Sequence, residues 1–159
     1  MIFRNKAGNP DISQITDYLY ISAWPKGEHA AEIRALNVRL ILSMHWRKPA
    51  RILGDAPVEL LWLPTVDSPL TPMPLATLQR GVAAALPVIR RGQAVLVHCQ
   101  AGRHRSVAMA CCVLIGLGYS ATEAMRLANE RRAVADPYIW YIRGRIEKFE
   151  QLWQNSEGV

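Results

Sequence analysis

Two residues that together suit oxyanion chemistry, Cys99 and Arg105, stand six positions apart between two apolar segments. A loop that ends at the start of a helix directs several backbone N–H groups to one point, where the helix dipole adds partial positive charge. The same field favours the thiolate of Cys99, which is the nucleophilic form. We therefore predict that the loop encloses a tetrahedral oxyanion beside a reactive thiolate. The residues expected to surround this anion are Gln100, Ala101, Gly102, Arg103, His104 and Arg105.

The side chains in and beside this loop suit the same chemistry. The planar guanidinium of Arg105 can donate two parallel hydrogen bonds to two oxygens of one anion. Gly102 permits the positive φ angle that a tight curl needs. We expect the Ser106 hydroxyl to hydrogen bond to the Cys99 sulfur and the ring N–H of His98 to brace the loop. The alternative is that Cys99 is a buried structural cysteine, the commonest state of a free thiol.

A carboxylic acid upstream, Asp67, is the candidate general acid. It follows the apolar segment 58–63, just as Cys99 follows the apolar segment 94–98. If both segments are strands of one parallel sheet, the loops after them lie at the same carboxyl edge, where ligands bind in such sheets. Asp67 is then placed to protonate the oxygen that leaves a phosphate ester. The alternative is that Asp67, which lies near two prolines, only forms a turn.

The stretch from His98 to Ser106, with the pattern His-Cys-x-x-Gly-x-x-Arg-Ser, resembles the signature of the cysteine-based protein tyrosine phosphatases. Over residues 12–152 the chain is similar to the compact dual-specificity group of that superfamily. This resemblance implies a single α/β domain over residues 1–159, with a central, mostly parallel, twisted sheet flanked by helices. It also implies that the substrate is a phosphorylated protein or another anionic phosphomonoester.

The resemblance further implies a mechanism with two steps and neither a metal nor another cofactor. Cys99 attacks phosphorus and forms a phosphocysteine, while Arg105 and the loop N–H groups hold the phosphate oxygens. Asp67 protonates the leaving group and then activates water, and Ser106 eases the departure of the sulfur. Because backbone dipoles and an arginine stabilise the charge, the reaction needs no metal.

The chain departs from the family pattern at two positions. Many members have an asparagine after a proline near the last helix, where it braces the phosphate loop, but here Pro137 is followed by Tyr138. The residue after the Arg-Ser pair, which is usually small, is Val107. The resemblance therefore does not identify the residue that holds this loop rigid.

The rim of the loop bears on the substrate. Arg103 and His104 are expected to point outward, where they either prefer a second negative group of the substrate or form only a generic basic rim. A phosphatase of non-protein substrates, such as phosphoinositides, is thus an alternative to a protein tyrosine, serine and threonine phosphatase. A phosphate-binding pseudophosphatase, a sulfurtransferase and an arsenate reductase also fit a cysteine loop that encloses an oxyanion.

Composition limits the remaining classes. Half of the 159 residues are apolar and the net charge is +6, which fits one globular domain that attracts anionic partners. The three cysteines do not make a disulfide framework, so we expect a reducing compartment, the cytoplasm. The N-terminus lacks the apolar stretch of a signal peptide, and the longest apolar run, 107–115, is shorter than the roughly 20 residues of a membrane span. The four histidines show no ligand spacing with the cysteines, so we expect no metal site.

The resemblance also implies an opening pair of strands within 15–22 and a strand at 38–43. Local patterns predict the helices. The ranges expected to be helical are 27–37, 74–90, 105–117, a helix opened by a capping box at 120–123, and a final helix opened by Asp136-Pro137 that ends near Trp153.

Several further residues are expected to be structural. Cys111 and Cys112 are predicted to lie in the core, with a redox role as the alternative. Asp136 is a helix cap or a rival general acid. Two further sets are expected to do no chemistry: Trp140, Tyr141 and Phe149 as helix packing, and Arg131-Arg132 as a solvated helix end rather than a nucleic-acid site.

Overall fold

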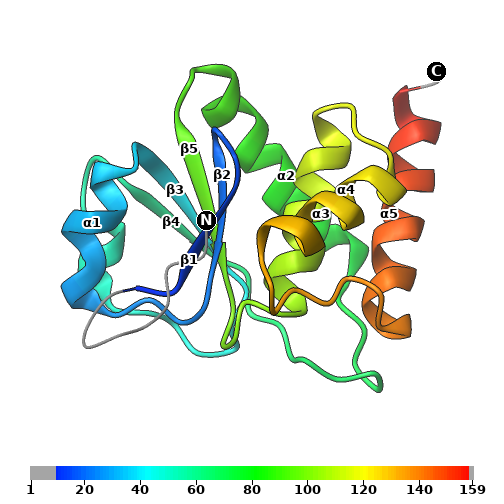
Figure 1. Ribbon diagram of the computed structural model, residues 1–159, viewed down its shortest axis with the longest axis horizontal. Coiled ribbons are helices and arrows are strands. Elements are labelled where there is room, and N and C mark those ends of the chain that lie inside the picture. The colour runs from blue at the N-terminus through cyan, green and yellow to red at the C-terminus, as the bar shows by residue number, and fades with distance from the viewer. Residues whose placement is uncertain (1–9, 158–159) are drawn as a thin grey trace.

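A computed structural model describes residues 10–157 and shows a five-stranded sheet with helices on both faces (Figure 1). The strands are β1 (Ile12–Thr16), β2 (Leu19–Ser22), β3 (Val38–Ser43), β4 (Glu59–Trp62) and β5 (Ala94–His98). The helices are α1 (Ala30–Ala35), α2 (Leu75–Arg90), α3 (Arg105–Gly116), α4 (Ala121–Arg131) and α5 (Trp140–Glu157), with short 3₁₀ turns at Gly27–His29 and Arg51–Gly54.

The sheet has the strand order β1-β2-β5-β3-β4, and β2, β5, β3 and β4 run parallel to one another. Only β1 is antiparallel, in its pairing with β2. The predicted mostly parallel α/β sheet is therefore confirmed. Because β4 and β5 run in the same direction, the loops that follow them, with Asp67 and Cys99, leave the same edge of the sheet.

The two faces of the sheet bury separate apolar clusters. Along β5, Val95 and Val97 face the larger cluster, which α2, α3, α4 and α5 cover. Ala94 and Leu96 face the smaller cluster, which α1 covers. This alternation follows from the two-residue period of a strand and gives β5 an apolar residue at four successive positions, as expected for a central parallel strand. Figure 1 shows the two layers of helices on opposite sides of the sheet.

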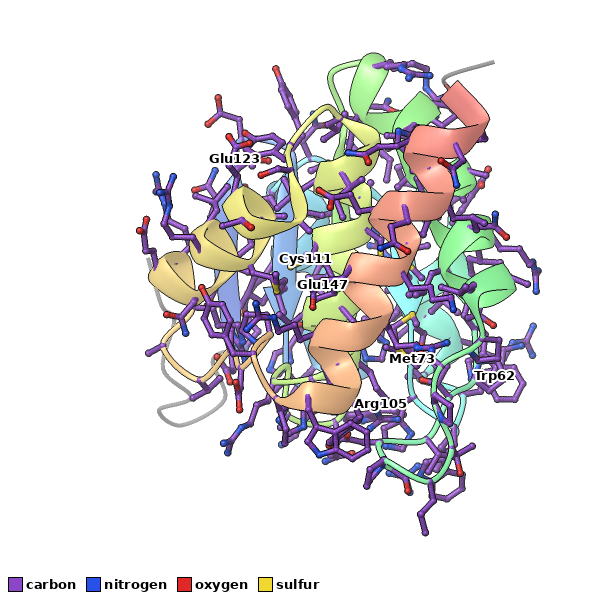
Figure 2. All side chains as sticks on the ribbon, turned by 90° about the vertical axis from the view of Figure 1, so that its right-hand side faces the viewer. Trp62, Met73, Arg105, Cys111, Glu123 and Glu147 are labelled. Carbon is purple, nitrogen blue, oxygen red and sulfur yellow. The ribbon has the colours of Figure 1, made fainter. Side chains whose placement is uncertain are left out.

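Helix α3, which starts at the end of the phosphate loop, is buried on all sides. It packs against β5 and against α2, α4 and α5. Cys111 and Cys112 within it are fully buried, and burial raises the pKa of both thiols well above the usual value for cysteine. Both cysteines therefore lie in the core, as predicted. Figure 2 shows Cys111 in the interior of the helical layer, apart from Arg105 at its lower end.

The capping box predicted at the start of α4 is confirmed, because Ser120 accepts a hydrogen bond from the Glu123 N–H and Glu123 accepts one from the Ser120 N–H. The predicted start of the last helix is wrong. Asp136 instead accepts a hydrogen bond from the Tyr138 N–H in a short turn. The first α-helical hydrogen bond then runs from Arg143 N to Ile139 O, so α5 begins three residues after Pro137.

Candidate active site

The loop between β5 and α3 closes tightly because of one glycine. Gly102 has a φ of +64°, which L-residues with a side chain rarely adopt. A Cβ atom at this position would lie 2.7 Å from the carbonyl oxygen of Ser22 and 2.6 Å from a side-chain nitrogen of Arg132. Both the backbone angle and the lack of space therefore require glycine here.

Cys99 lies beneath this loop and is 3% exposed. Its sulfur is 3.2 Å from the hydroxyl oxygen of Ser106. Burial acts to raise the pKa of Cys99, but hydrogen bonds from the Ser106 hydroxyl and from the backbone N–H groups of Ser106 and Arg103, together with the charge of Arg105, lower it below its ordinary value. The loop therefore stabilises a thiolate even though the sulfur is shielded from water.

The ring of His98 contacts the backbone at the start of the loop. The ring is fully buried, and its Nδ1 lies 3.2 Å from the carbonyl oxygen of Cys99. Burial lowers the pKa of His98 to about 4, so the ring is neutral near pH 7 and its Nδ1–H donates to that carbonyl. A neutral ring of this kind holds the backbone of Cys99 without placing a charge beside the sulfur.

Arg105 connects the phosphate loop to two neighbouring loops. Its Nη1 donates to the carbonyl oxygens of Thr65 at 2.8 Å and of Met44 at 3.3 Å. The residue is 5% exposed, and its Nε has no hydrogen-bond partner among residues 10–157. The guanidinium is thus held in place at one end, while a buried N–H donor is left for an oxyanion.

Asp67 hydrogen bonds to one residue of the phosphate loop and to one residue of α5. Its Oδ2 lies 2.9 Å from His104 Nδ1, and its Oδ1 accepts a hydrogen bond of 2.8 Å from the Tyr141 hydroxyl. Partial burial acts to raise the pKa of Asp67, but the hydrogen bonds from His104 and Tyr141 lower it below its ordinary value. Burial and the bond to Asp67 raise the pKa of Tyr141 to about 12, so its hydroxyl keeps the proton it donates.

The outward direction predicted for the two rim residues is correct for only one of them. Arg103 is 57% exposed and lies 4.0 Å from Asp136. The side chain of His104 is only 14% exposed, because it turns to the carboxylate of Asp67. Tyr141, which was expected to be helix packing alone, is part of the same cluster. It contacts Asp67 across 74 positions of sequence, so no local pattern indicates the pairing.

The expectations that Phe149 and Trp140 pack in the core and that Asp136 caps a helix are only partly correct. Phe149 packs in the core as predicted, whereas Trp140 is 71% exposed and does not. Asp136 is not a helix cap: its carboxylate forms a turn with the Tyr138 N–H and lies near Arg103.

Arg132 is the main functional residue that the sequence did not reveal. It was expected to lie at a solvated helix end, but its side chain is 1% exposed. Its Nε donates to Gly102 O at 2.7 Å and its Nη2 to Ala101 O at 3.0 Å, both in the phosphate loop. The guanidinium also pairs with both carboxylate oxygens of Asp11 at 3.0 Å and with Ser13 Oγ at 3.0 Å.

The ion pair between Arg132 and Asp11 explains how this arginine can be buried. Arg132 also contacts the phosphate loop, which an asparagine braces in many members of the family. Asp11 compensates the charge, and the loop carbonyls take the remaining donors, so the guanidinium is satisfied away from water. Tyr138, at the family's asparagine position, is 45% exposed. Arg132 therefore tethers the loop at Ala101 and Gly102.

A pocket of about 390 Å³ opens beside the loop. Its lining residues are His45, Trp46, Arg47, Val66, Asp67, Gln100 and Arg105. The loops after β3, β4 and β5 all contribute to it, as expected for the carboxyl edge of a parallel sheet.

Within residues 10–157 no group of three or more histidine, cysteine or acidic side chains is arranged to hold a metal ion. Within the same range no helix is long and apolar enough to cross a membrane.

Two curated phosphatases are similar to this chain in sequence. The human phosphatidylglycerophosphatase and protein-tyrosine phosphatase 1 is 40% identical over 125 residues, which are 73% of this chain and 59% of the human protein. The chain thus spans about three fifths of that relative. Mouse dual specificity phosphatase 28 is 28% identical over 153 residues, covering 94% of this chain and 90% of the mouse protein.

Solved structures show the same fold. A crystal structure of PTPMT1 superposes with a TM-score of 0.82 at 26% identity, covering 92% of this chain and 98% of the other. Human DUSP28 gives a TM-score of 0.80, also at 26% identity, over 92% of this chain and 97% of the other. The family model described as dual specificity phosphatase, catalytic domain, matches residues 19–151. The chain therefore belongs to the dual specificity phosphatase catalytic-domain family, a group of the cysteine-based protein tyrosine phosphatases.

Proposed function

We propose that the protein hydrolyses phosphomonoesters through a phosphocysteine formed on Cys99. The observation that carries this proposal is the environment of the sulfur. A buried thiol with a lowered pKa hydrogen bonds to Ser106 and lies beneath a loop of backbone N–H groups that ends at Arg105. Such a loop binds a phosphate and activates the nucleophile that attacks it.

In the first step the Cys99 thiolate attacks phosphorus and forms an S–P bond while the P–O bond to the leaving group breaks. The electron pair of that bond passes to the leaving oxygen, which takes a proton from Asp67. Arg105 and the N–H groups of residues 100–105 stabilise the charge on the other phosphate oxygens. Because the resting pKa of Asp67 is lowered, its protonated form is most populated at acidic pH, and we expect the fastest turnover below neutrality.

In the second step the Asp67 carboxylate takes a proton from water, whose oxygen attacks phosphorus. The S–P bond breaks and its electron pair returns to sulfur as a thiolate. The Ser106 hydroxyl donates to that thiolate, which makes the sulfur a better leaving group. Phosphate then leaves the loop, and Asp67 is again protonated.

The first candidate substrate, which membership of the dual specificity phosphatase family supports, is a phosphoprotein with phosphotyrosine, phosphoserine or phosphothreonine. A second candidate is a phospholipid monoester. The human relative at 40% identity has a name that includes phosphatidylglycerophosphatase, and PTPMT1 has a crystal structure in complex with PI(5)P. We further propose that residues 12–152 form the catalytic unit and that it works in the cytoplasm, where its three free cysteines stay reduced.

The test is release of phosphate from p-nitrophenyl phosphate by the wild type and by Cys99→Ser. Cys112→Ser, in the core of α3, is the matched control. Turnover that Cys99→Ser abolishes and Cys112→Ser keeps supports the phosphatase. Absence of turnover in the wild type indicates a phosphate-binding pseudophosphatase. Thiosulfate sulfurtransferase or arsenate reductase activity above the phosphatase activity contradicts the proposal.

A further inference from the structure

The pocket beside the phosphate loop contains an arginine that the proposed reaction does not use. Arg47 lines the same pocket as Arg105 and Gln100. Its guanidinium carbon lies 5.0 Å from the ring centroid of Trp24 and 5.8 Å from that of Trp46. Attraction to two indole faces restricts the guanidinium, and within residues 10–157 its N–H groups donate no hydrogen bond. Arg47 is thus an oriented cation at the edge of the site.

The backbone beneath Arg47 is also held in place. The N–H of Arg47 donates to His45 Nδ1 at 2.9 Å, and the His45 ring packs edge-on against Trp24 at 4.7 Å. Trp62 Nε1 donates to the His45 carbonyl oxygen at 2.9 Å. Burial, followed by the charge of Arg105, lowers the pKa of His45, so its ring accepts the N–H of Arg47 as a neutral imidazole.

The charges in the pocket are not balanced. In the part of the chain that the structure describes, Arg47 forms no ion pair with a carboxylate. The acidic residue of the pocket, Asp67, is already bonded to His104 and Tyr141. Arg47 and Arg105 are therefore two cations that line one pocket with a single carboxylate. The pocket volume of about 390 Å³ lies within the roughly 300–1,000 Å³ range of small-molecule sites, which leaves room beyond one phosphate.

We propose that Arg47, positioned by Trp24 and Trp46, binds a second phosphate of the substrate, a few bonds from the phosphomonoester that Cys99 attacks. This inference rests on the proposed function and adds a substrate class, compounds with two phosphate groups. It gives Arg47 the role that the sequence offered to Arg103 and His104; of these two, His104 is bonded to Asp67 and the exposed Arg103 lies 4.0 Å from Asp136. The second phosphate is the phosphodiester of a lipid headgroup or a phosphate of a water-soluble molecule, since both offer the same oxygens.

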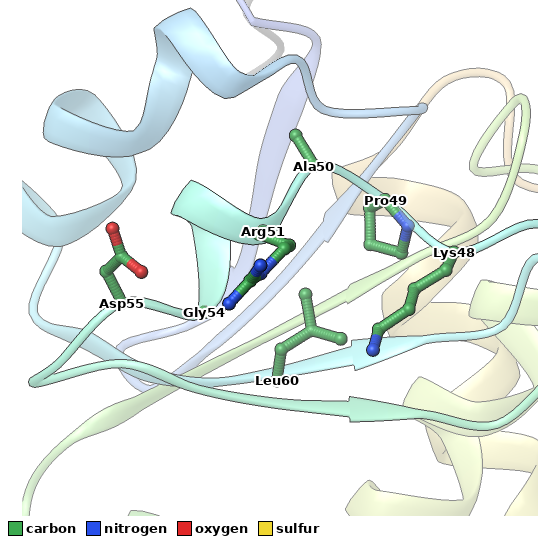
Figure 3. Close-up of a pocket in the computed structure, with 7 residues that line it drawn as sticks. All are labelled: Lys48, Pro49, Ala50, Arg51, Gly54, Asp55 and Leu60. Carbon is green, nitrogen blue, oxygen red and sulfur yellow. The ribbon is translucent and has the colours of Figure 1, made fainter.

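The neighbouring residue supplies a matched control. Lys48 has the same charge and is also exposed, but it lines a different pocket of about 250 Å³, beside β4, together with Arg51 and Asp55 (Figure 3). Lys48→Ala therefore removes one positive charge from the same loop without changing the active-site pocket. Any long-range effect of net charge on substrate attraction should appear equally in Lys48→Ala and Arg47→Ala.

The experiment compares kcat/KM for two soluble substrates. One is the deacylated headgroup of phosphatidylglycerophosphate, which has a phosphodiester and a terminal phosphomonoester; the other is glycerol 3-phosphate, which has the phosphomonoester alone. A charge-assisted hydrogen bond lost in a partly exposed site should lower the ratio of the two kcat/KM values about 10-fold in Arg47→Ala. Lys48→Ala should keep the wild-type ratio, and Arg47→Lys should restore part of it.

Two further arms identify the source of the second phosphate and separate the two proposals. In the first arm, kcat/KM for the intact lipid in phosphatidylcholine vesicles is divided by kcat/KM for glycerol 3-phosphate. If Arg47→Ala lowers this ratio more than it lowers the ratio for the soluble headgroup, the source is a lipid. If both ratios fall equally, the source is a water-soluble molecule. An unchanged ratio in Arg47→Ala on both forms overturns the second-phosphate site. Turnover of p-nitrophenyl phosphate by the wild type and by Cys99→Ser tests the phosphatase proposal alone, so an unchanged ratio in Arg47→Ala overturns only the second-phosphate site.

Discussion

Replacing Arg132 by methionine should both destabilise the protein and loosen the phosphate loop. Methionine fills much of the same volume but donates no hydrogen bond. The change leaves the carbonyls of Gly102 and Ala101 without their donors and leaves the Asp11 carboxylate without its cation. We therefore expect two separable effects, one on the free energy of unfolding and one on turnover.

The size of the stability effect follows from burial. Removing one partner of a buried ion pair costs about 3–5 kcal/mol. The side chain of Asp11 is 29% exposed, so water partly solvates it in the variant. The expected loss is thus near the lower end, about 3 kcal/mol, which for a chain of this size lowers the Tm by roughly 6–12 °C.

The control is Arg131→Met, because Arg131 is exposed and lies at the adjacent position. Urea unfolding followed by tryptophan fluorescence should show a change below about 0.5 kcal/mol for this variant. At a temperature where both variants are folded, Arg132→Met should lower kcat on p-nitrophenyl phosphate by roughly 10- to 100-fold, because a displacement of about 1 Å in a positioned site can cost about 100-fold. Equal urea midpoints for the two variants, or full kcat in Arg132→Met, would refute the bracing role of Arg132.

Three other predictions test the site. Tyr141→Phe removes a hydrogen bond that stabilises the Asp67 carboxylate, so the pKa of Asp67 should rise and its limb of the kcat/KM profile should move to higher pH, with the exposed Tyr138→Phe as control; an unmoved limb contradicts the contact. Ser106→Ala should raise the pKa of Cys99, which pH-dependent iodoacetate inactivation measures; an unchanged midpoint shows that Ser106 does not stabilise the thiolate. Gly102→Ala should lower the free energy of unfolding in urea more than Gly92→Ala does. Both glycines have positive φ, but only at Gly102 would a Cβ meet other atoms within 4 Å. Equal losses of about 1–3 kcal/mol would show that backbone strain alone accounts for the effect and would contradict the lack of space at Gly102.

The phosphate loop was predictable because its parts are contiguous in sequence. A strand, a glycine-containing curl and a helix start place Cys99, Arg105 and Ser106 by local backbone geometry alone. The position of Asp67 needed one further assumption, that its strand and the strand before Cys99 run parallel in one sheet, and the strand order confirms it.

The residues that support the loop were not predictable, because each depends on contacts between distant segments. Arg132 and Asp11 are 121 positions apart, and an arginine at the end of an amphipathic helix is solvated unless a carboxylate and carbonyls fold against it. The start of the last helix was misplaced for a related reason, since Asp136 favours a turn with Tyr138 over capping the helix.

The sequence by itself thus determined the chemistry: a thiolate, an arginine and a hydroxyl on one loop, with an acid at the same edge of a parallel sheet. Only the tertiary structure decided which residues support and surround these catalytic groups. In the folded chain His104 contacts Asp67 rather than solvent, Tyr141 hydrogen bonds to the same carboxylate, and Arg47 packs against Trp24. The physical reason is that local backbone geometry places adjacent residues, whereas burial and charge compensation are settled only when remote elements pack together.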